Sequence, residues 1–554
     1  MANSELRAEA DENALADDQE ASASVRALII QGQTVLGIEL GSTRIKACLI
    51  DSHSAPIAAG SAEWENELVG GVWTYSLDAV WSGLRRCYAD LLTDAERQYG
   101  VRPSSFRAIG VSAMMHGYLP FDASGELLVP FRTWRNTATG QAAAELTKTL
   151  GVNMPLRWSV AHLLQAVIDN EPHVPRIRFL TTLAGYVHWR LTGRKVLGVG
   201  DASGMFPIDP ATRNYDQRML RQVDALVAAR VADVRVADLL PEVLVAGRDA
   251  GRLTPEGAAL LDPGGTLRPG APFCPPEGDA GTGMVSTNSV RPRLGSVSVG
   301  TSIFAMVVLE KPLQKLHPEL DLVTTPAGDL VAMVHCNNGA SELGAWATVF
   351  EQFATAVGRP AQPDEVFGTL MRQALAGEAD GGGLLAYNYL SGEPITGMTE
   401  GRPLLVRTPD SRLTLANLAR TQVYSAFATL SLGMQVLAQE GVELESLFAQ
   451  GGLFRTPGVA QRLLAAALGA PVAVGHTAGE GGAWGIALLA AYLGTAPAHS
   501  LEDFLSTEVF ADTSFAVVDP DARDVEGFAA FLERYRDGLR IEQVAATAIS
   551  GGGQ

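Results

Sequence analysis

Two strand–turn–strand segments of the same design, one near the start of the 554 residues and one in the middle, constrain the fold more than any other feature. The first joins the apolar runs Val35–Leu40 and Ile45–Ile50 through Gly41-Ser42-Thr43, and the second carries Gly300-Thr301-Ser302 within 295–308. A glycine followed by two hydroxyl residues lets backbone and hydroxyl groups approach a phosphate closely. An ordinary hairpin turn explains either segment alone, but the pair predicts two related domains that each open with a phosphate-binding turn.

Helical and β-rich segments alternate along the rest of the chain, which is typical of α/β domains with mostly parallel sheets. The apolar spacing predicts helices at 76–99, 415–440, 457–468 and 525–546, and a strand at 108–112. The apolar pattern is interrupted at 287–293, where we expect a linker. The expected regions are a disordered acidic tail at 1–33, an N-terminal domain at 34–289, a C-terminal domain at 290–512 and a helical extension at 513–554.

The charge balance excludes large anionic partners. The chain has 42 Lys and Arg against 61 Asp and Glu, a net charge of −19, so no basic stripe is expected for a nucleic acid or an anionic membrane surface. A small phosphorylated ligand is still allowed, because a few backbone amides can hold a phosphate locally.

Other sequence features favour a cytoplasmic protein without a membrane anchor. The four cysteines are spaced neither as metal ligands nor as the disulfide framework of a secreted domain. The most apolar stretch, 481–493, is shorter than the ~18 residues of a membrane-spanning helix and is predicted to be a buried helix. Residues 1–22 contain no apolar signal segment.

Four residues of the expected N-terminal domain could carry chemistry. Glu39, just before the first turn, could attract Mg²⁺ or be an ordinary surface residue of a strand. Asp279, in a Gly-rich segment, could act as a general base or cap a helix. His116 follows a predicted strand and could bind a polyol or be a satisfied buried histidine. Trp134 could stack on a sugar or simply pack.

Several common motifs are absent from the sequence. The P-loop pattern does not occur, and Gly198–Gly204 misses the dinucleotide-binding pattern Gly-x-Gly-x-x-Gly by one residue. No Gly-x-Ser-x-Gly elbow of a serine hydrolase is found either.

Gly451-Gly452 starts a predicted helix and could admit an adenine ring, although a plain turn explains it equally.

The order of these motifs resembles the FGGY family of carbohydrate kinases, from about Thr34 to Leu493. The motifs that carry the resemblance are, in chain order, the segment 37–43, Met115-His116-Gly117, Gly278-Asp279-Ala280, Gly300-Thr301-Ser302, Gly451-Gly452 and the segment 480–487. The resemblance implies an α/β fold with two actin-like (ribonuclease H-like) ATPase domains around a central cleft. It also implies that ATP is held mainly by the second domain and a sugar or polyol mainly by the first.

The resemblance further implies roles for individual residues. Asp279 would be the catalytic base, and Glu39 would bind the Mg²⁺ that accompanies ATP. Substrate contacts are expected from Met115, His116, Trp134 and Asp279. ATP contacts are expected from Ser42, Thr43, Lys46, Thr301, Ser302, Gly339, Gly452 and Thr456. We therefore predict transfer of a phosphoryl group from ATP to a terminal hydroxyl of a sugar.

Met115-His116-Gly117 looks like the substrate segment of xylulose kinases, but three positions depart from the family pattern. Glu39 stands where most members have Asp, Trp134-Arg135-Asn136 stands where many have Trp-x-Asp-x-Arg, and Ala280 stands where pentulose kinases often have Asn. Another ketose, a polyol or a sugar acid therefore stays open as the substrate. A chaperone-like ATPase without a sugar substrate, a degenerate sugar sensor and a homodimer also stay open.

Overall fold

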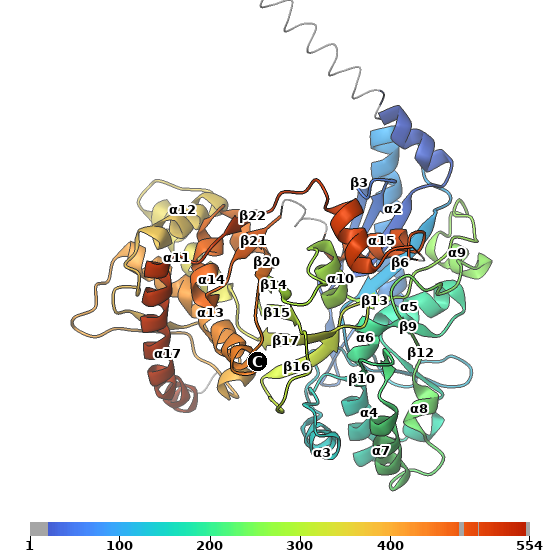
Figure 1. Cartoon of the computed structure of the whole chain (residues 1–554), viewed down its shortest axis with the longest axis horizontal. Coiled ribbons are helices and arrows are strands. Elements are labelled where there is room, and N and C mark those ends of the chain that lie inside the picture. Colours follow the sequence, from blue (N-terminus) through green and yellow to red (C-terminus); the bar gives the residue numbers. More distant parts are fainter. Residues whose placement is uncertain (1–19, 21, 476–480, 497, 550–554) are drawn as a thin grey trace, which may run out of the picture. The chain divides into compact units, whose positions relative to one another are not determined.

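The computed structural model describes residues 20, 22–475, 481–496 and 498–549, and the chain divides into two compact units (Figure 1). Unit 1 comprises Met1–Asn288, Val323–Asp329 and Glu480–Asp512. Unit 2 comprises Ser289–Leu322, Leu330–Gly479 and Thr513–Gln554. The first boundary falls inside the expected linker. Residues 481–496 and 498–512, which the sequence placed in the C-terminal domain, pack instead with unit 1.

Unit 1 is built on a five-stranded sheet in the order β13-β6-β1-β2-β3. β1 pairs antiparallel with β2, and β2 with β3, whereas β6 and β13 run parallel to β1 on its other side. The strands are β1 (Val35–Leu40), β2 (Arg44–Ile50), β3 (Pro56–Glu63), β6 (Ala108–Ala113) and β13 (Glu277–Gly278). The first predicted hairpin and the strand predicted at 108–112 are therefore confirmed.

Two helices, α2 (Leu77–Tyr99) and α15 (Gly481–Tyr492), cover opposite faces of this sheet. The strand register places Gly37 and Gly60 on opposite faces. A Cβ on Gly60 would lie 2.3 Å from Cys87 O of α2, and a Cβ on Gly37 would lie 2.1 Å from Ala483 O of α15. The predicted helices at 76–99 and 481–493 are thus confirmed, and Figure 1 shows the red α15 beside the blue strands of unit 1.

Further helices and short strand pairs surround the sheet of unit 1. The helices are α3 (Gly140–Leu150), α4 (Ser159–Ile168), α5 (Leu183–Thr192), α6 (Val199–Ser203), α7 (Gln217–Ala228), α8 (Val236–Leu239), α9 (Pro255–Leu261) and α10 (Asp279–Ser286). The strand pairs are β4–β5 (Glu67–Val69, Val72–Thr74), β7–β8 (Leu119–Phe121, Phe179–Thr181), β9–β12 (Val196–Gly198, Glu242–Leu244) and β10–β11 (Ile208–Asp209, Asn214–Tyr215).

Unit 2 repeats the arrangement of the first sheet. Its strands follow the order β16-β17-β15-β14-β20-β21-β22. β14 is antiparallel to β15, and β15 to β17, whereas β20 and β21 run parallel to β14. The strands are β14 (Leu294–Val299), β15 (Ile303–Val308), β16 (Leu320–Thr324), β17 (Leu330–Cys336), β20 (Ser446–Gln450), β21 (Val472–Val474) and β22 (Ala516–Val518). The five central strands thus have the topology of the sheet in unit 1, as the repeated hairpin predicted.

The helices of unit 2 close its core. The helices predicted at 415–440, 457–468 and 525–546 are confirmed as α13 (Leu415–Gln439), α14 (Val459–Leu468) and α17 (Ala522–Ala548). α17 is more than an extension, because Phe528, Phe531 and Tyr535 are buried in the core of unit 2. The other elements are α11 (Ser341–Ala356), α12 (Pro363–Ala376) and the strand pair β18–β19 (Leu385–Tyr387, Leu404–Val406).

The predicted disordered tail is wrong over its last part. Residues 22–30 are helical, and Ile29 is 1% exposed in the core of unit 1, with Val25 packed against it. Two apolar residues four positions apart lie on one face of a helix. This short pattern is easily overlooked because it directly follows an acidic, Ala-rich stretch. The expectation for residues 1–19 and 21 lies outside the described residues.

Two expectations from composition can be compared with the structure. All four cysteines are free and buried. Across the residues that the structure describes, none of the helices combines the length and the apolar character needed to cross a membrane.

The close contact between β1 and α15 predicts a specific stability effect. Gly37→Ala would place a methyl group against the backbone of Ala483 and Ala487, which cannot move aside as a flexible side chain would. We expect the free energy of unfolding to fall by about 1–3 kcal/mol or more. Gly140→Ala is the matched control, since a Cβ there meets no atom within 4 Å. Urea denaturation of both variants tests this, and wild-type stability of Gly37→Ala would contradict the packing.

Candidate active site

Glu39 lies on β1, on the sheet face that α15 covers, directly opposite Lys46 of β2. Its carboxylate accepts a hydrogen bond from the backbone of Ala483, and a Cβ on Gly482 would lie 2.3 Å from its Oε1. Burial and the charge of Asp279 raise the pKa of Glu39 to about 7, and Lys46 opposes this shift. Glu39 is therefore a partly buried carboxylate near Asp279 and not an ordinary surface residue.

Three aromatic side chains hold the first turn. Trp64 Nε1 donates to Gly41 O (2.7 Å), Tyr75 OH donates to Ser42 O (2.5 Å), and Trp134 Nε1 donates to Ser42 Oγ (3.3 Å). Trp134, which we expected at the sugar, thus lies beside the turn and packs partly against the core of unit 1. The other residues expected at this turn are Thr43, which is exposed, and Lys46, which is partly exposed.

Asp279 is the first residue of α10, directly after β13. The N-cap position belongs to Gly278, so a plain capping role does not explain the aspartate. Its Oδ1 accepts hydrogen bonds from Met115 N (3.1 Å) and Ala280 N (2.9 Å). Burial raises the pKa of Asp279 to about 6 although these hydrogen bonds lower it. A carboxyl group with a pKa close to neutral is suited to accept a proton.

His116 is a buried residue with an unusual backbone. Its φ of 72° is rare outside glycine, and such backbone strain often marks a functional position. Its Nδ1 lies 3.3 Å from Gly204 O, and its ring stacks on Trp158. Because a carbonyl only accepts, Nδ1 carries the hydrogen and Nε2 of the neutral ring is an acceptor. Burial, with Arg157 nearby, holds the pKa of His116 well below its usual value, so the ring stays neutral.

Asn136, one of the departures from the family pattern, has a structural role. Its Oδ1 accepts from Trp73 N (2.9 Å), and its Nδ2 donates to Trp73 O (2.8 Å) and Thr133 O (3.1 Å). An aspartate could make neither of the donated bonds. Arg135 lies over the Trp73 ring at 4.0 Å. This segment therefore anchors β5.

Two buried carboxylates beside Asp279 were not predicted. Glu277 is 1% exposed, and its Oε2 accepts a hydrogen bond from Asp201 N (2.8 Å). Burial, reinforced by Asp201, raises the pKa of Glu277 to about 8. Burial, with the charge of Asp279, raises the pKa of Asp201 to about 7, against a hydrogen bond from Thr182. The signals in the sequence were the Gly-rich segment 198–204 and the position of Glu277 two residues before Asp279.

In unit 2, the second turn packs directly against Gly339. Gly339 N donates to Thr301 O (2.7 Å), and Ala340 N donates to Gly300 O (2.8 Å). A Cβ on Gly339 would lie 2.4 Å from Gly300 O, so only glycine fits. Ser302 O accepts from Gly300 N (2.9 Å) and closes the turn. The structure therefore brings Thr301, Ser302 and Gly339 together.

The Gly451-Gly452 segment lies at the same edge of the sheet, because β14 and β20 run parallel and Ser298 is paired with Gln450. Gly451 has a φ of 116°, and a Cβ on it would lie 2.1 Å from Val299 O. Gly452 then opens a short 3₁₀ turn, Gly452–Arg455, which Thr456 follows. Five residues expected at the nucleotide are therefore gathered in unit 2: Thr301, Ser302, Gly339, Gly452 and Thr456. Ser42, Thr43 and Lys46 belong to unit 1.

The Gly339 segment is supported by polar residues that sequence reasoning missed. Asn388 Nδ2 donates to Asn338 O (3.1 Å) and to Gly339 O (2.8 Å). Asn338 Nδ2 in turn donates to Glu393 Oε2 (3.1 Å). Burial raises the pKa of Glu393 to about 7. Single polar residues separated by some 50 positions form no pattern that a sequence reveals.

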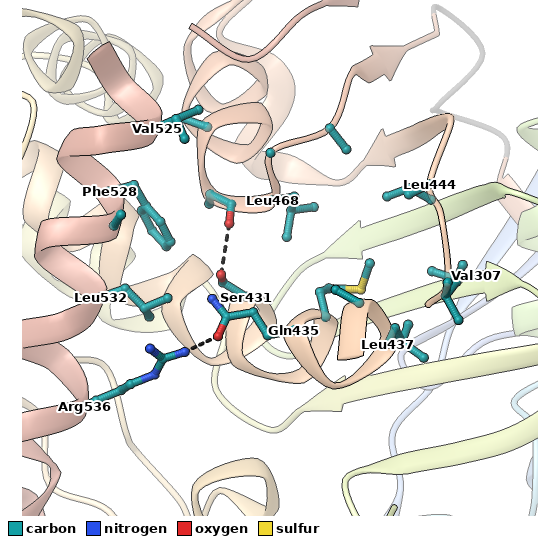
Figure 2. Close-up of a pocket in the computed structure, with 18 residues that line it drawn as sticks. Val307, Ser431, Gln435, Leu437, Leu444, Leu468, Val525, Phe528, Leu532 and Arg536 are labelled. Carbon is teal, nitrogen blue, oxygen red and sulfur yellow. Dashed lines mark hydrogen bonds between the residues drawn. The ribbon is translucent and has the colours of Figure 1, made fainter. Parts of the chain in front are cut away.

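Unit 2 also contains a cavity of about 420 Å³ (Figure 2). It is lined mainly by apolar side chains of α13, α14 and α17, including Leu437, Leu468 and Phe528. Val307, which also lines it, lies at the opposite end of β15 from the second turn. The cavity therefore does not coincide with the expected nucleotide site.

The residues present fit a magnesium ion that is held mainly by a nucleotide. Within the described part of the chain, no group of three or more His, Cys, Asp and Glu side chains is arranged to hold a metal ion. Mg²⁺ is usually bound through one or two carboxylates together with phosphates and water. Glu39, a partly buried carboxylate just before the first turn, meets that requirement.

Comparison with known proteins assigns both halves of the chain to one group of enzymes. The model of the N-terminal domain of the FGGY family of carbohydrate kinases matches residues 34–264, and the model of the C-terminal domain matches residues 295–494. The xylulose kinase of Haemophilus influenzae is 22% identical over 431 residues, which cover 75% of this chain and 82% of that protein.

Solved structures of sugar kinases show the same fold. A xylulose kinase from Rhodospirillum rubrum gives a TM-score of 0.74 at 20% identity, covering 92% of this chain and 99% of that chain. A gluconate kinase from Lactobacillus acidophilus gives a TM-score of 0.75 at 17% identity, covering 93% and 99%. The expectation of an α/β fold with two actin-like domains is therefore confirmed.

Gly339→Ala tests the contact that assembles the residues of unit 2. The added methyl would meet Gly300 O, so the second turn must move. Because overpacking costs about 1–3 kcal/mol, we expect ATP to bind roughly tenfold more weakly or worse, with sugar binding unchanged. Gly344→Ala is the matched control, since a Cβ there meets no atom within 4 Å. Titration calorimetry measures the affinities for ATP and for the sugar. Wild-type affinity for ATP in Gly339→Ala would contradict a role of this contact in ATP binding.

Proposed function

The chain belongs to the FGGY family of carbohydrate kinases, and on this premise we propose that it phosphorylates a terminal hydroxyl of a ketose, a pentulose such as xylulose, at the expense of ATP. Family membership makes it a phosphotransferase with an alcohol group as acceptor. The pentulose is supported by Met115-His116-Gly117 and by the similarity to a xylulose kinase along most of the chain.

The observation that carries this proposal is the link between Asp279 and the segment Met115-His116. Met115 N donates to Asp279 Oδ1 (3.1 Å), so the aspartate and the neighbouring histidine share one backbone anchor. The neutral His116 ring offers Nε2 as an acceptor, and Asp279 offers its second carboxylate oxygen. Both groups accept hydrogen bonds, which suits a ligand that carries several hydroxyl groups.

In the proposed reaction, Asp279 Oδ2 accepts the proton of the terminal hydroxyl, whose oxygen attacks the γ-phosphorus of ATP in line. The bond from this phosphorus to the oxygen that bridges it to the β-phosphate breaks, and ADP leaves. His116 Nε2 accepts a hydrogen bond from another hydroxyl and orients the sugar. The five residues gathered in unit 2 bind the nucleotide. Mg²⁺, held by Glu39 together with the phosphates, would supply neutralisation of the charge that develops on the transferred group.

The raised pKa of Asp279 determines the direction of the pH dependence. Only the carboxylate accepts a proton, and its pKa is about 6 instead of 3.8. We expect kcat/KM for the sugar to be constant at alkaline pH and to fall as the pH decreases through about 6. Glu39 titrates close by, so the measured value belongs to the coupled pair. A pH–rate profile that stays flat well below pH 6 would exclude Asp279 as the base.

Asp279→Asn removes the base while keeping its shape. We expect kcat to fall by about 10²–10⁴-fold with an unchanged KM for ATP. Folding raises the pKa of Asp279 to about 6, so at higher pH the ionised side chain lowers the stability of the folded protein. At such pH values the variant, which carries no charge at this position, should melt at the same or a higher temperature than the wild type. Asp78→Asn, an exposed aspartate in the first turn of α2, is the control. Wild-type turnover of Asp279→Asn would show that another group takes the proton.

A screen of acceptors tests the substrate class. ADP release is measured with xylulose, ribulose, glycerol and gluconate as acceptors, and the phosphorylated carbon of the product is identified by NMR. We expect the highest kcat/KM with xylulose and phosphate on a terminal carbon. Turnover of gluconate alone would replace the ketose by a sugar acid. Turnover of none of the four, with ATP still bound, would contradict the proposal.

A further inference from the structure

The Gly-rich segment Gly198–Gly204, which matches no nucleotide-binding pattern, joins two parts of the proposed sugar site. It contains the end of β9 and the single-turn helix α6, Val199–Ser203. At one end the segment contacts Glu277, two residues before Asp279. At the other end it contacts His116. Its glycines are required at both ends, for different neighbours.

At the first end, the segment encloses the carboxylate of Glu277. Oε1 accepts from Gly200 N (3.3 Å), and Oε2 accepts from Asp201 N (2.8 Å). A Cβ on Gly198 would lie 2.1 Å from Oε1, and a Cβ on Gly200 would lie 2.4 Å from Oε2. Because β13 consists of Glu277 and Gly278 alone, this anchor determines where the following Asp279 begins α10.

At the other end, the segment contacts the residues of the sugar site. Gly204 O lies 3.3 Å from His116 Nδ1, and a Cβ on Gly204 would lie 2.7 Å from this nitrogen and 2.8 Å from Met115 Cε. Met115 N donates to Asp279 Oδ1 (3.1 Å). The contacts thus form a closed circuit from Asp279 through Met115-His116, the segment and Glu277 back to Asp279.

Hydrogen bonds to Thr182 and to Thr324, the last residue of β16 and itself part of unit 1, hold the segment. Ser203 Oγ donates to Gly200 O (2.5 Å) and accepts from Thr324 N (3.1 Å). Thr324 Oγ1 donates to Val199 O (3.0 Å), and Thr182 Oγ1 donates to Asp201 Oδ2 (2.6 Å). These hydrogen bonds fix the backbone of the segment, so the segment can determine the distance between the groups that contact its two ends.

We propose that Glu277 and Gly204 are positioning residues, and that the segment between their contacts sets the separation of the Asp279 carboxylate and the His116 imidazole. This separation decides which hydroxyl of a bound sugar reaches the base. The inference rests on the proposed function, because the two residues then define a single sugar site. A displacement of about 1 Å at such a site can lower turnover roughly a hundredfold.

Glu277→Gln tests one end of the circuit in the full-length protein. Above its pKa of about 8, Glu277 is ionised and both of its oxygens accept from backbone N–H groups, so the assays are run there. An amide offers only one acceptor oxygen, so its NH₂ group must face one of the two donors. We expect kcat with the sugar to fall roughly ten- to hundredfold, with an unchanged KM for ATP. Glu242→Gln is the matched control, since Glu242 lies on β12 beside β9 with a side chain that is 57% exposed.

Gly204→Ala tests the other end. The added methyl would displace His116, so we expect mainly a higher KM for the sugar. Because both substitutions break one circuit, their combined effect on kcat/KM should be smaller than the product of the single effects. A fully multiplicative effect would mean that the two ends act independently.

Amide hydrogen exchange gives a readout that needs no sugar. Glu277 makes no hydrogen bond to Met115, but the circuit connects them through Asp279. We expect faster exchange in peptides that contain Met115 in both Glu277→Gln and Gly204→Ala, with unchanged exchange in β1. Wild-type exchange at Met115 in both variants would overturn the inference, whereas failure of the acceptor screen or of Asp279→Asn would affect only the proposed function.

Ser203→Ala provides a milder variant in case Glu277→Gln does not fold. It removes the two hydrogen bonds of Ser203 Oγ and leaves Glu277 unchanged. We expect effects in the same direction but smaller, on both kcat and exchange at Met115. Wild-type values of both quantities in Ser203→Ala would also overturn the inference.

Discussion

The hydrogen bond from Met115 N to Asp279 Oδ1 joins two segments that lie far apart in the sequence, and the organisation of the proposed sugar site depends on it. It can form only because β6 and β13 are parallel neighbours, so that the residues following each strand emerge at the same sheet edge. The bond stabilises a carboxylate that burial would otherwise disfavour. It also ties the backbone next to His116, the following residue along the chain, to the same carboxylate.

The duplicated sheet topology gives each unit the same kind of edge, and the two units use it differently. In unit 1 the edge carries carboxylates, Glu39 on β1 and Asp279 after β13, together with His116. In unit 2 the corresponding edge carries glycines that bring Gly339 against the second turn. Carboxylates suit the transfer of a proton, and exposed backbone amides suit the binding of phosphates. This difference supports the proposal that unit 1 binds the sugar and unit 2 binds most of the nucleotide.

Much of the fold could be predicted from the sequence. The two hairpins and the longest helices have strong local patterns, a glycine turn between β-branched runs or apolar residues at helical spacing. The association of α15 with unit 1 could not be predicted, because it depends on the space that Gly37 leaves on one sheet face. The helical residues 22–30 were missed because their apolar face is only a few residues long.

The candidate site was predictable only in part, for a similar reason. Asp279 and His116 stand in short, unusual motifs that the sequence reveals. The place of Glu277 and Asp201 in the site becomes visible only in the structure, where Gly198–Gly204 folds around the carboxylate of Glu277. Asn136 departs from the family pattern in the sequence, and in the structure it anchors β5 through hydrogen bonds to Trp73. Side chains that support a site through the backbone of distant segments leave no regular spacing in a sequence.

The most direct test of this account is a crystal structure of the protein with ADP and xylulose. The account predicts that a terminal hydroxyl of the sugar lies within hydrogen-bonding distance of Asp279 and that another hydroxyl donates to His116 Nε2. A sugar bound away from Asp279, or a terminal hydroxyl that faces a different base, would contradict it.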